Sequence, residues 1–356
     1  MIKEKNIIFI AISSLLFFSL LYFPNLLISP DTKTFTRVGS SIVSFSSLFS
    51  PTVMEEPQYL MTYLIFKFIL LFDNFEFTFK IINFLSFLII VIFSQKILLF
   101  YKINFKTKFD YLFFLFLYFY NFEILQWTYY GLTDLILVSL ILMAIYYFLI
   151  GNIPVTILIF IFSILIKPQS IFILFLVTFI FINRLNYKKY LFFYLYILFY
   201  ILIFFSTFLI NKYGENIFIL NTIAKYTHWV FLKKLFEGII IDDRIFIEYE
   251  NFFSIIKIYF LRFVNFYSIY FEEFSLRHRL YKISYFFVLY APILFFMFKR
   301  NYMNKEFIEF SIGSIIIVSL FFVLTIIDYD LRYRLYVYPF LIMLSSYCFQ
   351  KIYAQK

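Results

Sequence analysis

Residues 77–99 read FTFKIINFLSFLIIVIFSQKILL. The stretch is long enough to cross a bilayer, because a helical span needs about 20 mostly apolar residues. Four lysines surround its end, Lys96, Lys102, Lys106 and Lys108. An apolar run beside a basic cluster recurs along the chain and predicts a helical membrane protein.

The composition excludes a water-soluble or disordered chain. Of the 356 residues, 63% are apolar and 15% are charged, and the mean hydropathy is +0.90. Soluble domains contain about 45–50% apolar and about 25% charged residues. Disordered chains are poor in aromatic residues, whereas this one has 59 Phe and 32 Tyr. Its one cysteine, Cys348, provides no disulfide framework.

We predict an all-α integral membrane protein with ten transmembrane helices. The predicted spans are residues 7–28, 77–99, 109–125, 132–150, 154–166, 170–182, 191–210, 284–298, 307–327 and 335–349. An even number of spans places both termini on one side, where the basic clusters also fall. The positive-inside rule makes that side the cytoplasm. The net charge of +10 is therefore a topology signal, and we expect a multi-pass protein of the inner (plasma) membrane.

The chain reads as one polytopic domain, 1–356, with two large segments outside the cytoplasm. Residues 29–76 form the first extracytoplasmic loop, in which the apolar run 59–72 is too short for a span and predicts an interfacial helix. Residues 211–282 form an extracytoplasmic insertion. Its segment 251–272 has polar positions on one helical face, which favours a helix that lies in the membrane plane. If this segment crossed the membrane instead, the number of spans would be odd and the two termini would lie on opposite sides.

Carboxylates in the first outer loop are candidate reactive groups. Asp31 follows the first span and could take a proton from a substrate hydroxyl as general base. The alternative is a turn or capping residue after Pro30. Glu55 and Glu56 could share a metal or position a sugar, or could be solvated loop charges.

Two charged residues bracket the fourth and fifth spans. Thr133-Asp134 begins the fourth span and could cap it, with or without a role in function. Lys167-Pro168 breaks the apolar run between the fifth and sixth spans. Lys167 is a suitable point charge for a lipid phosphate, and the alternative is a lysine that snorkels to the interface.

Arginines form the remaining candidate contacts for anions. Arg332 and Arg334 enter the last span and suit phosphate or pyrophosphate, or ion pairs with Asp328 and Asp330. Arg277 and Arg279 flank His278 in the insertion, where the histidine is interpreted as structural. With two histidines in the chain there is no three-histidine metal site, and the one cofactor considered is a carboxylate-bound divalent cation.

Four stretches together resemble the GT-C superfamily of polytopic glycosyltransferases, in particular the bacterial branch of aminoarabinose-lipid A and protein-mannosyl transferases. We call them the family-like stretches: Pro30-Asp31-x-x-x-Phe35-x-x-x-Gly39; Pro57-Gln-Tyr59 with Asn83; Thr133-Asp134 with Lys167-Pro168; and Arg332-Tyr-Arg-Leu-Tyr-Val-Tyr-Pro339-Phe. The chain departs from the family pattern, because Phe35 replaces the usual Tyr, Tyr336 replaces a usual Pro and Asp31 stands where Asp-Glu is usual.

The resemblance implies an inverting sugar transfer from a polyprenyl-phosphate donor to a lipid, glycan or protein acceptor on the outer face. Asp31 would be the general base and Asp134 would support the catalytic site. Lys167, Arg332 and Arg334 would contact the lipid phosphate. Glu55, Glu56 and Tyr59 would be sugar or cation contacts. Membrane lipids are the other expected partners, and nucleic acid is not one.

Two rival functions have their own sequence signals. A polysaccharide polymerase of the O-antigen or exopolysaccharide type would use arginines in large outer loops, and Arg277 and Arg279 could serve. A transporter or flippase predicts broken spans in matching halves and charges at the midplane. The charges here cluster at one face and the halves do not match, so we expect the glycosyltransferase first and the transporter last.

Overall fold

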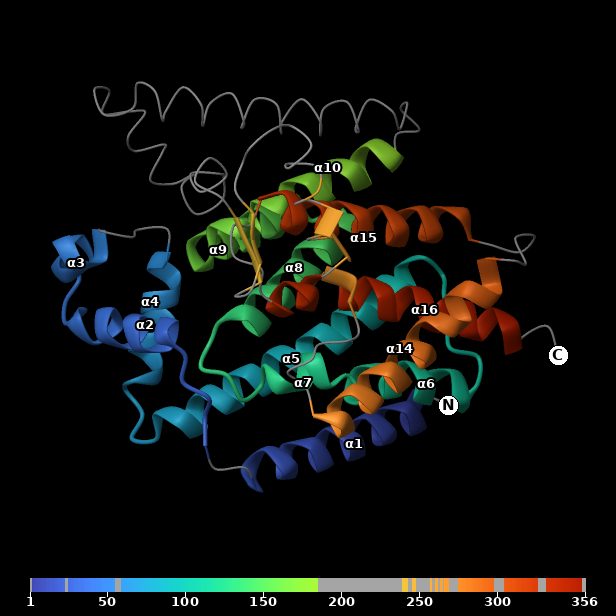
Figure 1. The fold of residues 1–356 in the computed structure, drawn as a ribbon, viewed down its shortest axis with the longest axis horizontal. Coiled ribbons are helices and arrows are strands. Elements are labelled where there is room, and N and C mark those ends of the chain that lie inside the picture. The colour runs from blue at the N-terminus through green and yellow to red at the C-terminus, as the bar shows by residue number, and fades with distance from the viewer. Residues whose placement is uncertain are drawn as a thin grey trace.

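The structure is a computed structural model that describes residues 2–22, 25–54, 59–184, 239–242, 245–247, 257, 260–261, 263–264, 266–268, 275–297, 304–325 and 331–353. These residues are overwhelmingly helical (Figure 1). The predicted seventh span, 191–210, lies outside the described residues, as do most of segment 251–272 and the pair Glu55 and Glu56.

Three described helices are long and apolar enough to cross a membrane: α5 (Phe75–Phe100), α14 (Leu276–Met297) and α15 (Lys305–Thr325). The other helices of at least ten residues are α1 (Ile2–Tyr22), α2 (Pro30–Ser41), α4 (Leu60–Ile69), α6 (Lys108–Phe119), α8 (Asp134–Leu149), α9 (Ile153–Ile166), α10 (Phe172–Arg184) and α16 (Tyr338–Tyr353). The chain is therefore a helical protein with the features of a membrane protein, and the prediction of ten spans stays a prediction.

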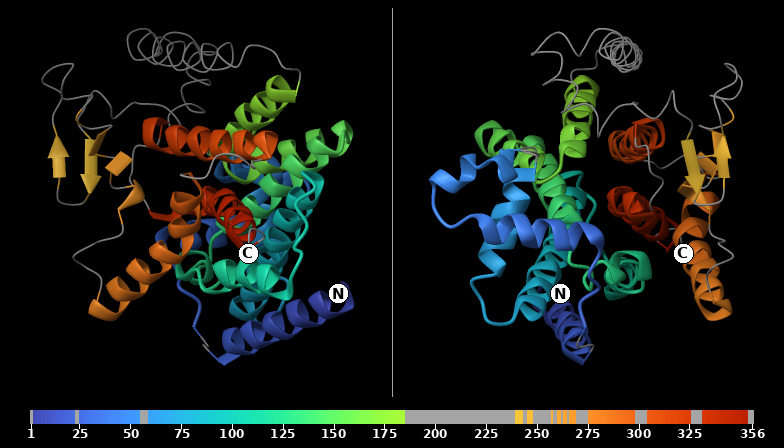
Figure 2. Two further views of the ribbon diagram at one scale, coloured as in Figure 1. Left: turned by 90° about the vertical axis from the view of Figure 1, so that its right-hand side faces the viewer. Right: turned by 60° about the vertical axis from the view of Figure 1, so that its left-hand side comes forward.

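Short elements connect these helices. They are η1 (Ser46–Phe49), α3 (Pro51–Met54), α7 (Phe122–Gln126), η3 (Pro168–Ile171) and η7 (Leu331–Tyr336). Two strands, β1 (Ile239–Asp242) and β2 (Ile245–Ile247), pair antiparallel and lie beside α14 and α15 (Figure 2). The all-helical prediction did not include this small antiparallel ribbon.

Local sequence explains where several helices begin. Asn74 caps α5 by accepting from the Phe77 amide, and Thr107 with Asp110 forms a reciprocal capping box at α6. Between α8 and α9 the chain reverses at Gly151, whose φ of +82° favours glycine. Pro154 then occupies the first turn of α9, where its missing amide hydrogen costs nothing.

Three helix boundaries differ from the predicted spans. The predicted span 7–28 ends too late, because α1 ends at Tyr22 and residues 25–28 are not helical. The predicted span 109–125 breaks after α6, because Asn121 caps the separate helix α7 through the amide of Ile124. The predicted span 284–298 begins about two turns too late, because α14 starts at Leu276. Arg277, Arg279 and Lys282 therefore lie on a helix and not in a loop.

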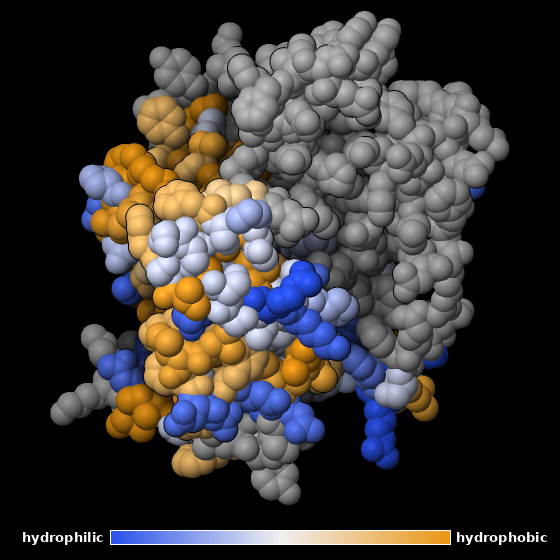
Figure 3. All heavy atoms as spheres, turned by 90° about the vertical axis from the view of Figure 1, so that its left-hand side faces the viewer, coloured by the Kyte–Doolittle hydropathy of each residue, from blue (hydrophilic) through white to orange (hydrophobic). Residues whose placement is uncertain are grey.

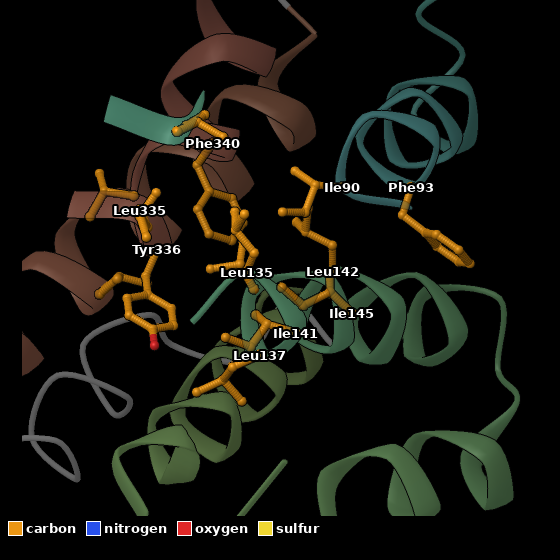
Figure 4. Packing of buried hydrophobic residues seen from close by; sticks show 14 of the residues in the cluster. Ile90, Phe93, Leu135, Leu137, Ile141, Leu142, Ile145, Leu335, Tyr336 and Phe340 are labelled. Atoms are coloured by element: carbon orange, nitrogen blue, oxygen red, sulfur yellow. The ribbon is translucent and has the colours of Figure 1, made fainter. Parts of the chain in front are cut away.

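The core is built around α8 and α16. Most side chains of α8 are buried, including Leu135, Ile141 and Ile145, as expected for a helix that is apolar all round. Figure 4 shows these side chains meeting Ile90 of α5 and Phe340 of α16. Helix α16 contacts α5, α6, α14 and α15, so it joins the early and late helices into one body.

The first predicted outer loop lies at one end of the molecule. In Figure 1, α2, α3 and α4 occupy one end, while α1 begins and α16 ends toward the other. Viewed from the α2 end, the described surface shows apolar patches among polar ones (Figure 3). Val43, Phe45 and Phe49 are prominently exposed there, which is compatible with a segment that touches a membrane interface.

Candidate functional site

Asp134 and Lys167 form a buried ion pair where α8 begins and α9 ends, at the opposite end of these helices from the turn at Gly151. The Lys167 ammonium donates to both carboxylate oxygens of Asp134, at 2.7 and 2.8 Å. Asp134 is fully buried and Lys167 is 6% exposed. The alternative of a lysine that snorkels to the interface is therefore wrong, because a protein carboxylate holds the Lys167 ammonium; the predicted contact of Lys167 with a lipid phosphate stays a prediction.

The helix ends place this pair. Asp134 opens α8, where the positive end of the helix dipole favours a carboxylate. Lys167 follows the last residue of α9, in extended conformation, and Pro168 starts η3. The predicted cap at Thr133 is absent, because its side chain makes no capping hydrogen bond at α8. Sequence reasoning thus found both residues but did not pair them.

Tyr336 brings η7 to the same pair. Its hydroxyl donates to Asp134 Oδ1 at 3.1 Å. The ring stacks on Phe322 and meets Phe172 edge-on, with centroids 4.9 and 5.7 Å apart. Tyr336 therefore links η7 to the buried Asp134–Lys167 pair.

Asp31 lies in the first turn of α2, exposed at the surface. Ser29 and Thr32 form a capping box, and Pro30 starts the helix. The side chain that caps α2 is therefore that of Ser29. Asp31 does not have the capping role considered for it.

The loop before Asp134 holds the start of α2 in place. The Thr32 hydroxyl donates to the Gly131 carbonyl at 2.9 Å, and the Leu27 amide donates to the Tyr129 carbonyl at 2.7 Å. A Cβ at Gly131 would lie 2.7 Å from Thr32 Cγ2, so only glycine fits this contact. Asp31 is therefore fixed to the segment that leads into Asp134.

Aromatic packing fixes the other side of α2. Phe35 packs on Tyr59, Tyr63 and Phe66, with ring centroids 5.4 to 6.0 Å apart. Gly39 lets α2 approach α4, because a Cβ there would meet three α4 atoms at 3.1 Å. Tyr59 is buried in this contact at 8% exposure, so packing accounts for its place, and its predicted substrate role stays a prediction.

Two side chains, Asn83 and Thr62, join segments that lie next to the second and third family-like stretches. Asn83 donates to the carbonyls of Trp127 and Tyr130, at 3.2 and 2.8 Å. Thr62 donates to the carbonyl of Ile166 at 2.8 Å, and so satisfies an orphan carbonyl at the end of α9. Together with the bonds of Thr32 and Tyr336, these bonds bring the described residues of the family-like stretches, or residues next to them, close to one another; Pro57 lies outside the described residues.

The predicted arginines differ in how far they are buried and in what they contact. Arg277 is exposed and Arg279 half-buried in the first turn of α14. The backbone of Arg332 lies in η7, and its side chain is outside the description, as are Asp328 and Asp330. Arg334 is 7% exposed and its guanidinium reaches Glu123.

Sequence reasoning missed a second buried cluster, which we call the Glu123 cluster: Glu123, Lys282, Arg334 and Tyr338. Lys282 Nζ lies 2.7 Å and Arg334 Nη1 3.4 Å from Glu123 Oε1, and the Tyr338 hydroxyl donates to Glu123 Oε2. The sequence did contain a signal for this cluster, because Glu123 is a carboxylate inside the apolar run 109–125. Ionisable groups within such runs are candidate functional residues by default.

The charge of Glu123 is stabilised by its neighbours. Its carboxylate is buried between the Lys282 ammonium and the Arg334 guanidinium, and both cations offset the cost of burying a negative charge.

The Glu123 cluster borders a cavity of about 50 Å³, which we call the α14 cavity. Its walls include Tyr281, Tyr285, Phe286 and Leu289 of α14. Tyr285 accepts from Asn121 and donates to the Leu117 carbonyl, which ties this wall to the turn between α6 and α7. A space of this size holds a few water molecules or one small polar group.

Within the described residues, no three His, Cys, Asp or Glu side chains gather in a way that could hold a metal ion. Comparisons of the chain with protein-family models, with curated proteins and with solved structures find no match. The functional argument therefore depends on the geometry of the chain itself.

Proposed function

We propose that this protein is a membrane-embedded glycosyltransferase that moves a sugar from a polyprenyl-phosphate donor to a lipid, glycan or protein acceptor. One observation carries the proposal: the first, second and fourth family-like stretches each bond to the segment 129–134, which ends at Thr133-Asp134 of the third. The bonds run from Thr32 to Gly131, from Asn83 to Tyr130 and from Tyr336 to Asp134. This convergence supports a shared site.

Asp31 is the proposed general base. Its carboxylate is exposed at the start of a helix that is anchored on both sides, so it can meet a substrate without rearrangement of the core. In the proposed step the acceptor hydroxyl attacks the anomeric carbon of the sugar, and Asp31 takes the hydroxyl proton. The bond from that carbon to the phosphate oxygen breaks, and the polyprenyl phosphate leaves with both bonding electrons.

Asp134 and Lys167 act in this proposal as positioning residues. Their buried pair fixes the end of the loop on which Asp31 is anchored, through Gly131 and Thr32. A base displaced by about 1 Å can lose about 100-fold in rate, so such support matters to catalysis. The arginines of the fourth stretch remain the proposed contacts for the leaving phosphate.

The test is a transfer assay in membranes that contain the chain, with a panel of radiolabelled polyprenyl-phosphate sugars and extracted cell-envelope lipids as acceptors. We expect Asp31→Asn to lower transfer by about 100-fold or more, in line with loss of a general base. Asp73→Asn is the matched control, because Asp73 is exposed in the same predicted loop, between α4 and α5.

Equal losses in both variants, or full activity of Asp31→Asn, would remove the catalytic assignment. Transfer with none of the donors by the unaltered chain would overturn the glycosyltransferase proposal. Extension of a glycan chain by repeated units would instead support the polymerase.

A further inference from the structure

Each of the three described helices that could cross a membrane has one end at the same side of the molecule. Phe296, near the end of α14, and Phe307, near the start of α15, both pack on the Tyr347 ring of α16, with ring centroids 6.1 and 5.2 Å apart. Tyr101, directly after α5, packs on Phe307 at 5.5 Å. Both chain termini lie towards this end in Figure 1. Since such helices end where the bilayer meets water, we expect this end at the level of the lipid headgroups.

Lysines surround this end of the molecule. They are Lys102, Lys106, Lys108, Lys305 and Lys351, and we call them the basic rim. All of them except Lys351 are exposed. The carboxylates described at this end are Asp110, which is buried in its capping box, and Glu306 and Glu309 in the first turns of α15. Cations therefore outnumber carboxylates among the side chains described here.

The loop after α5 turns its lysines away from the core. Tyr101, Ile103 and Phe105 are buried, whereas Lys102 and Lys106 are exposed. This alternation is that of an extended segment, whose successive side chains point to opposite faces. The apolar side chains thus anchor the loop in the core, and the lysines lie on its outer face.

Side chains from three distant segments hold the backbone of this loop. Asn304, at the start of α15, donates to the Tyr101 carbonyl at 2.9 Å. Lys5 of α1 donates to the Phe105 carbonyl at 2.7 Å, and Gln350 of α16 donates to a carbonyl between these two. The lysines are therefore presented from a backbone that is fixed before a ligand arrives, which lowers the entropic cost of binding.

Lys102 occupies a backbone conformation that favours glycine, with a φ of +59°. Its amide donates to the Leu99 carbonyl and the Ile103 amide donates to the Leu98 carbonyl, both at 2.9 Å, which is the Schellman arrangement at a helix end. Glycine is the usual residue at this position, because a side chain is strained there. A lysine kept at a strained and exposed position points to a use for its charge.

We propose that the basic rim binds the headgroups of anionic phospholipids, with Lys102 and Lys106 as its central contacts. Ammonium groups at the level of the headgroups attract anionic lipids, and each lysine adds to the affinity. The proposal uses none of the residues of the candidate functional site, so it goes beyond sugar transfer and does not depend on it. Lysines that served only to orient the chain during insertion would show no preference among lipids in the folded protein.

The experiment uses the full chain in detergent micelles with two added lipids. Phosphatidylglycerol is anionic, whereas phosphatidylcholine with the same acyl chains is zwitterionic. Native mass spectrometry counts the bound lipid and gives the affinity of each. We expect phosphatidylglycerol to bind about 20-fold more tightly, because two lysines near a headgroup contribute about fivefold each. The preference should fall as salt is added, since salt screens exposed charges.

Lys102→Gly separates lipid binding from folding, because its two expected effects have opposite signs. It relieves the backbone strain, so it should raise the midpoint of thermal unfolding in lipid-free micelles by about 1–2 °C. It should also lower the affinity for phosphatidylglycerol about fivefold. Lys102→Arg keeps the charge and should keep the affinity. Lys33→Met is the control, because it removes an exposed charge from α2 at the other end of the molecule and should leave the affinity unchanged.

Three results would overturn the proposal. Equal affinities for the two lipids would remove the recognition of charge. An unchanged affinity in Lys102→Gly, or an equal loss in Lys33→Met, would remove the basic rim as the site. A midpoint of unfolding that does not rise in Lys102→Gly would remove the strain on which the choice of Lys102 depends.

Discussion

Breaking the Asp134–Lys167 pair should cost more stability than the loss of any surface charge. Lys167→Met removes the ammonium that contacts both carboxylate oxygens at 2.7 and 2.8 Å, and leaves Asp134 fully buried. At an effective dielectric constant of about 20, unit charges about 3.5 Å apart attract by roughly 5 kcal/mol. Removing one partner of a buried pair typically costs about 3–5 kcal/mol, because the other charge remains uncompensated.

The measurement is the free energy of unfolding in detergent micelles. Trp127 is a suitable reporter, because it is buried and its carbonyl accepts from Asn83 beside the loop that leads to Asp134. We expect Lys167→Met and Asp134→Asn each to lose about 3–5 kcal/mol. The double variant should lose clearly less than the sum, because neither charge is then left alone.

Lys33→Met is the matched control, since Lys33 is an exposed lysine on α2. Its effect should stay within about 0.5 kcal/mol. The reasoning fails if Lys167→Met lies within about 1 kcal/mol of the unaltered protein. It also fails if the two single losses add up in the double variant, because the two side chains would then not be coupled.

Three further predictions follow from the same region. Gly131→Ala places a Cβ 2.7 Å from Thr32 Cγ2, so it should destabilise the protein by about 1–3 kcal/mol and lower transfer, as measured by unfolding and by the donor assay; an unchanged protein would contradict the close contact. Glu123→Gln removes the carboxylate that the buried Lys282 and Arg334 contact at 2.7 and 3.4 Å, so it should lower the free energy of unfolding by about 3–5 kcal/mol. A variant as stable as the unaltered protein would refute the ion pairs. Asp31→Cys should react with a membrane-impermeant thiol reagent added outside intact cells, whereas the buried Cys348 should not, and labelling only after permeabilisation would overturn the predicted topology.

The long apolar helices could be predicted from sequence because their signal is local. The prediction 77–99 agrees with α5 (Phe75–Phe100), and 307–327 agrees with α15 (Lys305–Thr325), each within two residues. An uninterrupted apolar run leaves few alternatives for a helix of that length. The Lys167-Pro168 break was predicted for the same reason, since proline acts on the turn in which it stands.

The partners of the charged residues could not be predicted, because they are set by packing between distant segments. The predicted insertion 211–282 places Lys282 in a loop before the next span. In the structure, Glu123 of α7 accepts its ammonium, and α14 continues through the cluster. Lys167 likewise has its carboxylate on the preceding helix. A charge pattern predicts which side of a membrane a residue prefers, but not the side chain that neutralises it.

The 3₁₀-helix η7 links the two buried charge clusters. Tyr336 bonds to Asp134, while Arg334, two residues earlier, reaches Glu123. Side chains two positions apart on a helix point to different sides, so one short element serves both clusters at once. A shift of η7 that tightened one contact would strain the other, since buried polar networks tolerate little displacement.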